Sequence, residues 1–161
     1  IEYLVNNNVS YEDAWLISKI SNNAEKNLDL VNDVTFNVVK NQLANSLKHL
    51  GNKNDYFIVD FLVEGMKNLT ENSSIELFLD MLEVCLLEAI IKQEDKEHKS
   101  VIFDEHISKI SEKYQHIDHM IDDITKAKID LLSNANKNLV FDKLLINLLR
   151  RWEPWITKIQ M

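Results

Sequence analysis

Residues 73–91 read SSIELFLDMLEVCLLEAII, and this run dictates the class of fold. On a helix its charges Glu76, Asp80 and Glu83 fall along one narrow line, and apolar residues occupy nearly every other side. A helix that is apolar on most of its sides is buried among other helices. We therefore predict that 75–91 is the central helix of a bundle.

Helical patterns flank this run on both sides. Apolar residues recur every three or four positions, which places them on one side of each expected helix. These stripes are Phe36, Val39, Leu43, Leu47 and Leu50; Ile58, Phe61, Leu62, Met66 and Leu69; Ile107, Ile110, Tyr114, Ile117, Ile121 and Ile124; and Phe141, Leu144, Leu145, Leu148 and Leu149. We expect Gly51 and Asn52 to stop the first helix and Pro154 to end or kink the last. The third stripe, within 104–133, fits either one long helix or two that break near His116.

Shorter elements are expected at the start of the chain. Residues 1–5 look like the end of a helix, and helices are predicted over about 11–20 and from residue 22 to Val31. Three pairs have capping-box spacing, in which an N-cap side chain accepts a backbone N–H and an acidic side chain three residues later reaches back: Ser10 with Asp13, Asn22 with Glu25, and Ser73 with Glu76. Because short helices are unstable alone in water, this part must pack on the rest.

Composition agrees with an all-α fold. The 161 residues are 45% hydrophobic and 27% charged, enough for a real core, and two Gly and one Pro are too few for the frequent turns of a sheet protein. The net charge of −8 repels phosphate backbones, so a main nucleic-acid contact is not expected here. Residues 92–100 are charged and predict an exposed loop or a frayed helix end.

The cysteine content and the first residues of the chain bear on where the protein is expected to act. The single Cys85 permits neither an internal disulfide nor a Cys-based zinc site, and it is expected to be a buried small apolar residue in a reduced cytoplasmic protein. We see no signal peptide, and Glu83 and Glu88 interrupt the longest apolar run, so no membrane contact is expected. Because the chain opens with Ile1 rather than Met, we expect it to be part of a longer protein.

The strongest candidate for a metal site is the group His106, His116 and His119, with Asp118, Asp122 and Asp123 nearby. His116 and His119 are three residues apart and share one side of a helix. No Glu stands between them as in His-Glu-x-x-His, and no third ligand stands at a suitable spacing. Gly51 and Gly65 are too isolated for a phosphate-binding loop. We therefore expect a solvated polar side, with no metal, cofactor or catalytic residue.

Residues 127–148, AKIDLLSNANKNLVFDKLLINL, resemble the end of bacterial clamp-loader subunits. In that family a helix carrying an Ala and a Leu is followed by Asn-x-Asn and a Leu-rich closing helix, as in the delta-prime subunit of DNA polymerase III and more loosely in delta and gamma/tau. The matching positions are Asn134, Asn136, Leu139 and Phe141, while Asp142 stands where the family often has Glu.

Residues 9–28, VSYEDAWLISKISNNAEKNL, are similar to the later helices of the small lid that follows an AAA+ nucleotide-binding domain. ATP-hydrolysing members have a nucleotide-sensing arginine there, and this chain has Glu25 or Lys26 instead. The missing arginine is like delta-prime, which does not hydrolyse ATP. The charged 92–100 segment and the Trp-rich tail after Leu149 depart from the family pattern.

The resemblance implies a lid remnant at 1–32 and a collar domain for oligomerisation at 33–161. The collars of five subunits form a ring in the pentameric complex that loads the sliding clamp during DNA replication. The expected partners are the delta and gamma/tau subunits, and DNA and the clamp are reached only through parts upstream. The residues expected near a subunit contact are Leu144, Leu145, Leu148, Leu149 and Trp152. Trp152 and Trp155 fit either this contact or a cap on the end of the bundle.

Three alternatives stay open from the sequence. The segment could belong to delta or gamma/tau rather than delta-prime. It could be a small metal-dependent helical enzyme that uses His106, His116 and His119. It could also be an unrelated helical adaptor or toxin–antitoxin-type protein, whereas the clamp-loader interpretation requires an AAA+ domain ahead of Ile1.

Overall fold

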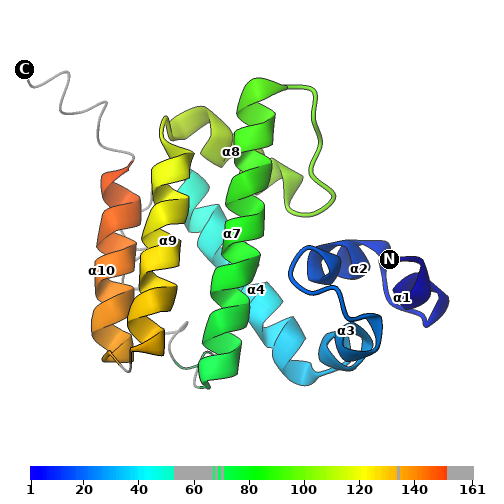
Figure 1. The fold of residues 1–161 in the computed structure, drawn as a ribbon. Coiled ribbons are helices and arrows are strands. Elements are labelled where there is room, and N and C mark those ends of the chain that lie inside the picture. The colour runs from blue at the N-terminus through cyan, green and yellow to red at the C-terminus, as the bar shows by residue number, and fades with distance from the viewer. Residues whose placement is uncertain (53–66, 68, 70, 134, 152–161) are drawn as a thin grey trace, which may run out of the picture.

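The computed structural model describes residues 1–52, 67, 69, 71–133 and 135–151, and of Leu149 it describes the backbone alone. Over these residues the fold is all-α, as predicted, with eight helices and no strand (Figure 1). The helices are α1 (Glu2–Asn6), α2 (Tyr11–Ser18), α3 (Ala24–Val31), α4 (Val34–Asn52), α7 (Asn72–Glu94), α8 (Asp104–Lys113), α9 (Ile117–Leu132) and α10 (Lys137–Arg150).

The central helix of the bundle is α7, as its apolar sides predict. It packs against α4, α8 and α9, and eleven of its residues are buried. The predicted capping box of Ser73 and Glu76 is wrong, because the helix already begins at Asn72 and Ser73 lies inside its first turn. Its neighbour Ser74 donates a hydrogen bond of 2.9 Å to the carbonyl oxygen of Glu71 instead.

The apolar stripe of α4 is buried as predicted, with each of its five residues at most 1% exposed. The prediction that Gly51 and Asn52 stop this helix is right to within one residue, since α4 ends at Asn52, but Gly51 itself is still helical. Gly51 is buried where α4 meets α8, and a Cβ placed on it would lie 3.2 Å from the Cβ of Lys109. The missing side chain therefore serves the close approach of two helices rather than a helix end.

Residues 104–133 form two helices, which decides between the two alternatives left by the sequence. The break lies between Lys113 and Ile117, near His116. Tyr114, extended and buried in this break, donates from its hydroxyl to the carbonyl oxygen of Leu50 at 3.1 Å. Gln93 of α7 donates to the carbonyl oxygen of Tyr114 at 2.6 Å. The break is thus anchored to both α4 and α7.

The three short helices lie together at one end of α4 (Figure 1). Ser10 caps α2 by accepting the backbone N–H of Asp13 at 3.2 Å, as predicted. The Asp13 carboxylate pairs with Lys40 at 2.7 Å and so ties α2 to α4. The cap of α3 is Asn23 rather than the predicted Asn22, because the helix begins one residue later.

Two predictions fall mainly outside the described residues. Of the stripe from Ile58 to Leu69, only Leu69 is described, and it is buried. Pro154 also lies outside the described residues, so the predicted end or kink stays a prediction.

Candidate functional site

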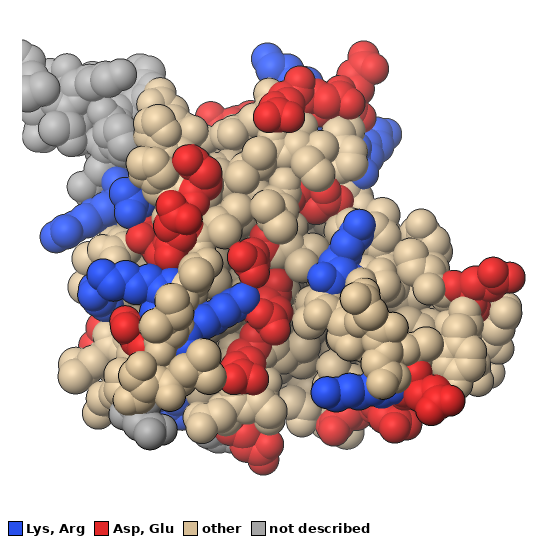
Figure 2. Space-filling model, viewed as in Figure 1, with Lys and Arg blue, Asp and Glu red and all other residues tan. Residues whose placement is uncertain are grey.

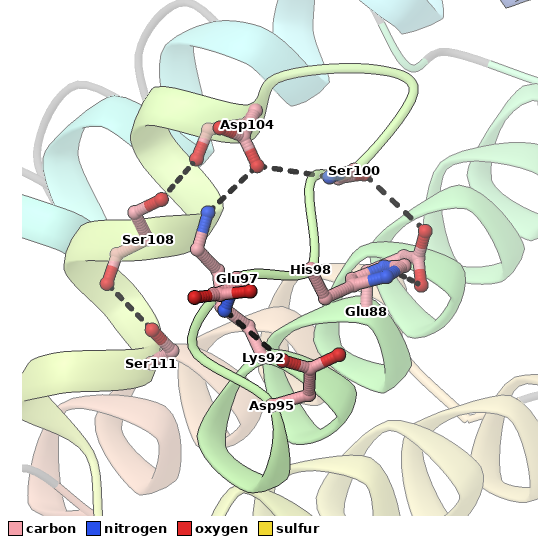
Figure 3. A network of polar contacts seen from close by, with 9 residues as sticks. All are labelled: Glu88, Lys92, Asp95, Glu97, His98, Ser100, Asp104, Ser108 and Ser111. Carbon is pink, nitrogen blue, oxygen red and sulfur yellow. Dashed lines mark hydrogen bonds and ion pairs between the residues drawn. The ribbon is translucent and has the colours of Figure 1, made fainter.

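A partly buried polar cluster joins α7 to the loop that follows it (Figure 3). Glu88, 7% exposed, lies within 3.2 Å of the Nε2 atom of His98 through one carboxylate oxygen. Its other oxygen accepts the hydroxyl of Ser100 at 3.4 Å. A nucleophilic triad needs the histidine between hydroxyl and carboxylate. Here the carboxylate stands in the middle, so the cluster fastens the loop and does not activate the serine.

A second set of contacts closes the same loop against α8. Asp104 accepts hydrogen bonds from Lys92 at 2.8 Å and from the backbone N–H of Ser100 at 2.9 Å. The hydrogen bond from Lys92 is the main reason that the pKa of Asp104 lies below its usual value. The prediction that 92–100 is an exposed loop or a frayed helix end holds for residues 93–97 and Lys99, which are exposed. It is wrong for Lys92, whose side chain is 13% exposed and lies in an ion pair, and for Ser100, which is buried.

Two of the three acidic residues in the line on α7 are tied to α9. Figure 2 shows acidic side chains in a row over α7, with a basic side chain reaching them from the neighbouring helix. Lys128 of α9 pairs with Asp80 at 2.6 Å and with Glu83 at 2.9 Å. Burial alone would lower the pKa of Lys128, but these two carboxylates raise it. The row is thus a helix-to-helix tie and does not form an acid–base pair.

The single thiol is placed for packing. Cys85 is 1% exposed, and burial, with Glu88 nearby, raises its pKa far above the usual value. A thiol held neutral is a poor nucleophile and a poor metal ligand. The prediction of a buried small apolar residue is confirmed.

A cleft of about 480 Å³ separates α3 from the first half of α7. Its charged lining consists of Asp33, Glu71, Glu76, Asp80 and Lys26. Asp80 is paired with Lys128, and the other three carboxylates against the single Lys26 ammonium still give a negative potential, which opposes the binding of a nucleotide phosphate. Of these groups Asp33 caps the start of α4, by accepting the N–H of Thr35 at 2.9 Å.

A second, apolar groove of about 350 Å³ lies between α2 and α7. Trp15 and Lys19 line it from α2, and Leu87 and Ile91 are its exposed apolar residues on α7, at 47% and 44%. Lys19 lies 5.4 Å from the ring centroid of Trp15, a cation–π distance.

The predicted contact residues of the last helix divide in the structure. Leu144, Leu145 and Leu148 are at most 3% exposed and pack into the core of this chain. The Leu149 side chain and Trp152 lie outside the described residues, so their proposed contact stays a prediction. Among the described residues, the large apolar side chains of α10 that are exposed are instead those of Leu139, 67% exposed, and Ile146, 45% exposed.

The residues of the motif that resembles the clamp-loader family lie in different environments. Asn136 caps α10, because its Oδ1 atom accepts the backbone N–H groups of Asn138 at 2.9 Å and Leu139 at 3.3 Å. Phe141 is fully buried. Asn134 lies outside the described residues.

Exposed aliphatic residues mark the outer surface of the last two helices. Ile129 and Leu132 on α9 are 57% and 74% exposed, and together with Leu139 and Ile146 we call them the outer aliphatic set. Leu132 lines a pocket with Asn72 and Ile75 at the start of α7, whereas Leu139 and Ile146 share one side of α10 by their helical spacing. Single exposed aliphatics are normal, but large ones that share one side of a helix are a candidate contact surface. Of the residues expected near a subunit contact, Leu144, Leu145 and Leu148 lie on the buried side of α10.

The structure brings part of the predicted histidine group together. His116, Asp118 and His119 are all exposed, and one ligand atom of each lies within 4.8 Å of the others. His106 belongs to α8 and is not in this group. Sequence spacing had identified the histidine pair but had not selected Asp118 as the third ligand.

Comparisons with models of known protein families, with curated proteins and with solved structures find no match for this chain. Within the described part of the chain, no helix combines the length and the apolar character needed to cross a membrane.

Proposed function

We propose that this chain is a non-catalytic assembly segment: the C-terminal part of a bacterial clamp-loader subunit, most similar to delta-prime. In this proposal it acts in the cytoplasm, in DNA replication, as part of a subunit of the DNA polymerase III complex. It binds the delta and gamma/tau subunits through the outer side of α9 and α10. DNA and the sliding clamp are contacted by other parts of the assembly.

The observation that carries the proposal is the outer aliphatic set on the last two helices. Transferring a Leu or Ile side chain from water to an apolar interface is favourable by about 1.5–3 kcal/mol. Stable interfaces combine such apolar centres with a polar rim. Lys143 and Arg150, both exposed on α10, supply polar groups beside Leu139 and Ile146.

The order of the parts also supports this function. Three short helices precede a bundle of longer ones, which is the order of a lid end followed by a collar. The last helix begins directly after Asn136, its cap, at the Asn-x-Asn position of the resembling family. The buried thiol and the acidic cleft favour a scaffold over an enzyme.

The decisive experiment measures binding of this chain to purified delta and gamma/tau subunits. The variant Leu139→Lys/Ile146→Lys replaces two aliphatic side chains of the proposed contact by charged ones. Loss of both side chains removes at least about 3 kcal/mol, so the dissociation constant rises about 100-fold or more. The matched control is Val34→Lys on α4, which replaces an aliphatic residue that is 77% exposed.

The outcomes separate the alternatives. Unchanged binding of the double variant, or equal loss in the Val34→Lys control, contradicts the placement on α10. Trp152→Ala tests the predicted tail contact in the same assay. If the unaltered chain binds neither subunit, the clamp-loader assignment is wrong and an unrelated helical adaptor is favoured. A pair Leu87→Lys/Ile91→Lys then tests the apolar groove for other partners.

A further inference from the structure

Two imidazoles and a carboxylate meet at the start of α9. His116 is the N-cap residue of that helix, and Asp118 and His119 lie in its first turn. The Nε2 atom of His119 is 3.6 Å from an Oδ atom of Asp118. The rings of His116 and His119 are stacked, with centroids 5.1 Å apart. One ligand atom from each of the three residues lies within 4.8 Å of the other two.

The backbone beneath these side chains is held firmly. Tyr114 and Ile117 are each 1% exposed and Met120 is fully buried, so core residues anchor the segment before, within and after the cluster. The backbone N–H of His119 donates to the carbonyl oxygen of His116 at 3.1 Å. The ligand-bearing side chains themselves are exposed and already lie beside one another. A fixed backbone and neighbouring ligands lower the entropic cost of closing around an ion.

The local charge favours a cation despite the position at a helix N-terminus. The helix dipole opposes positive charge there. However, Asp118, Asp122 and Asp123 all lie near the Arg151 guanidinium, which is hydrogen-bonded to Asp123, so three negative charges stand against one positive charge. The pKa of Arg151 is raised first by its hydrogen bond to Asp123 and further by the charges of Asp122 and Asp118. The carboxylates therefore outweigh the partial charge of the helix end.

We propose that His116, Asp118 and His119 bind one divalent transition-metal ion of the Zn²⁺ class. Imidazole nitrogens favour zinc, nickel and copper over magnesium and calcium, which prefer oxygen ligands. Zn²⁺ takes nitrogen and carboxylate oxygen at about 2.0–2.2 Å, so tetrahedral ligands stand about 3.4 Å apart. Side-chain rotations close the remaining distance. The three protein ligands leave the fourth position to water.

This site is independent of the proposed subunit contact. It needs neither the outer aliphatic set nor a partner, so either proposal can fail alone. Bound metal would link the break between α8 and α9 to the first turn of α9. It would thereby stabilise the junction that Tyr114 already anchors.

The test is calorimetric titration of the tag-free chain with zinc chloride at pH 7.5. We expect one ion per chain and a dissociation constant on the order of micromolar. His116→Gln and His119→Gln each weaken binding about tenfold or more, since each removes one of three ligands. His106→Gln is the matched control, because it removes a histidine outside the cluster and leaves the affinity unchanged.

A thermal unfolding series supplies a second measurement. At 100 times the dissociation constant, zinc raises the melting temperature by about 5–10 °C, and His119→Gln loses this shift. All three variants fold without metal because the replaced side chains are not in the core. Absence of binding at 100 times the expected dissociation constant overturns the proposal. Equal weakening in the His106→Gln control overturns it as well.

Discussion

The ion pair between Arg151 and Asp123 fixes the end of α10 on α9, and breaking it from either side has unequal costs. Arg151 donates from Nε and Nη2 to the two carboxylate oxygens at 3.0 and 2.9 Å. The Asp123 side chain is 10% exposed, whereas that of Arg151 is 35% exposed. The carboxylate depends on its partner, while the guanidinium can still reach water.

This difference gives the expected magnitudes. Arg151→Met leaves a largely buried carboxylate unpaired, beside the charges of Asp122 and Asp118, and lowers the free energy of unfolding by about 2 kcal/mol. Asp123→Asn keeps one acceptor and leaves a solvated cation, so it costs about 1 kcal/mol. Partial exposure of Arg151 screens the pair and limits the coupling energy to about 1 kcal/mol.

The assay is a double-mutant cycle of urea unfolding, followed by circular dichroism. The four proteins are the unaltered chain, Arg151→Met, Asp123→Asn and the double variant. Repeating the cycle in 1 M salt should reduce the coupling energy, since the Debye length falls to about 3 Å. The reasoning is refuted if Asp123→Asn costs as much as Arg151→Met, or if the two effects simply add.

Three further predictions concern packing, pH and the buried carboxylate. Gly51→Ala gains up to about 1 kcal/mol in helix propensity but brings a Cβ to 3.2 Å from Lys109, so we expect no net gain in unfolding free energy, and Gly51→Val should lose about 2 kcal/mol or more. Because Lys92 lowers the pKa of Asp104, the ionised carboxylate stabilises the folded chain at pH values above its ordinary pKa. This contribution is lost as the pH falls through the pKa that Asp104 has in the folded chain. The free energy of unfolding of Asp104→Asn, measured against pH, should therefore converge with that of the unaltered chain in acid. Glu88→Ala leaves the buried Ser100 hydroxyl and the partly exposed His98 ring without their partner, and it should cost about 1–3 kcal/mol in urea unfolding, with faster amide exchange in the following loop. Unchanged exchange would contradict the fastening role.

The fold class and the central helix could be predicted because they rest on strong periodic signals. The apolar sides of α7 leave burial in a bundle as the only stable placement. Helix starts were less predictable, as Ser73 and Asn22 illustrate. Several polar residues stand near each start, and each offers a cap of similar energy. Tertiary packing selects among them, so the sequence alone does not.

The polar contacts of the loop after α7 could not be predicted. His98 and Ser100 lie ten and twelve positions from Glu88, and no helical period relates them. Their meeting depends on how the chain turns back along α7. The role of Gly51 could not be predicted either. A glycine near a helix end suggests that the helix stops there, whereas here its missing side chain allows Lys109 of α8 to lie close to α4. Both features depend on contacts between segments far apart in the chain.

The proposed contact on α10 concerns the side of the helix that its apolar period does not select. A Leu-rich helix has apolar residues on two sides, and spacing alone does not tell which side faces the core of its own chain. Leu144 and Leu148 belong to the apolar stripe of this helix, and that stripe is the side buried in the core. The side chains left for a partner are those off the stripe, Leu139 and Ile146, which a stable monomer does not require. Charges placed at these two positions should therefore abolish assembly while leaving the unfolding free energy almost unchanged, a separation that core residues cannot give.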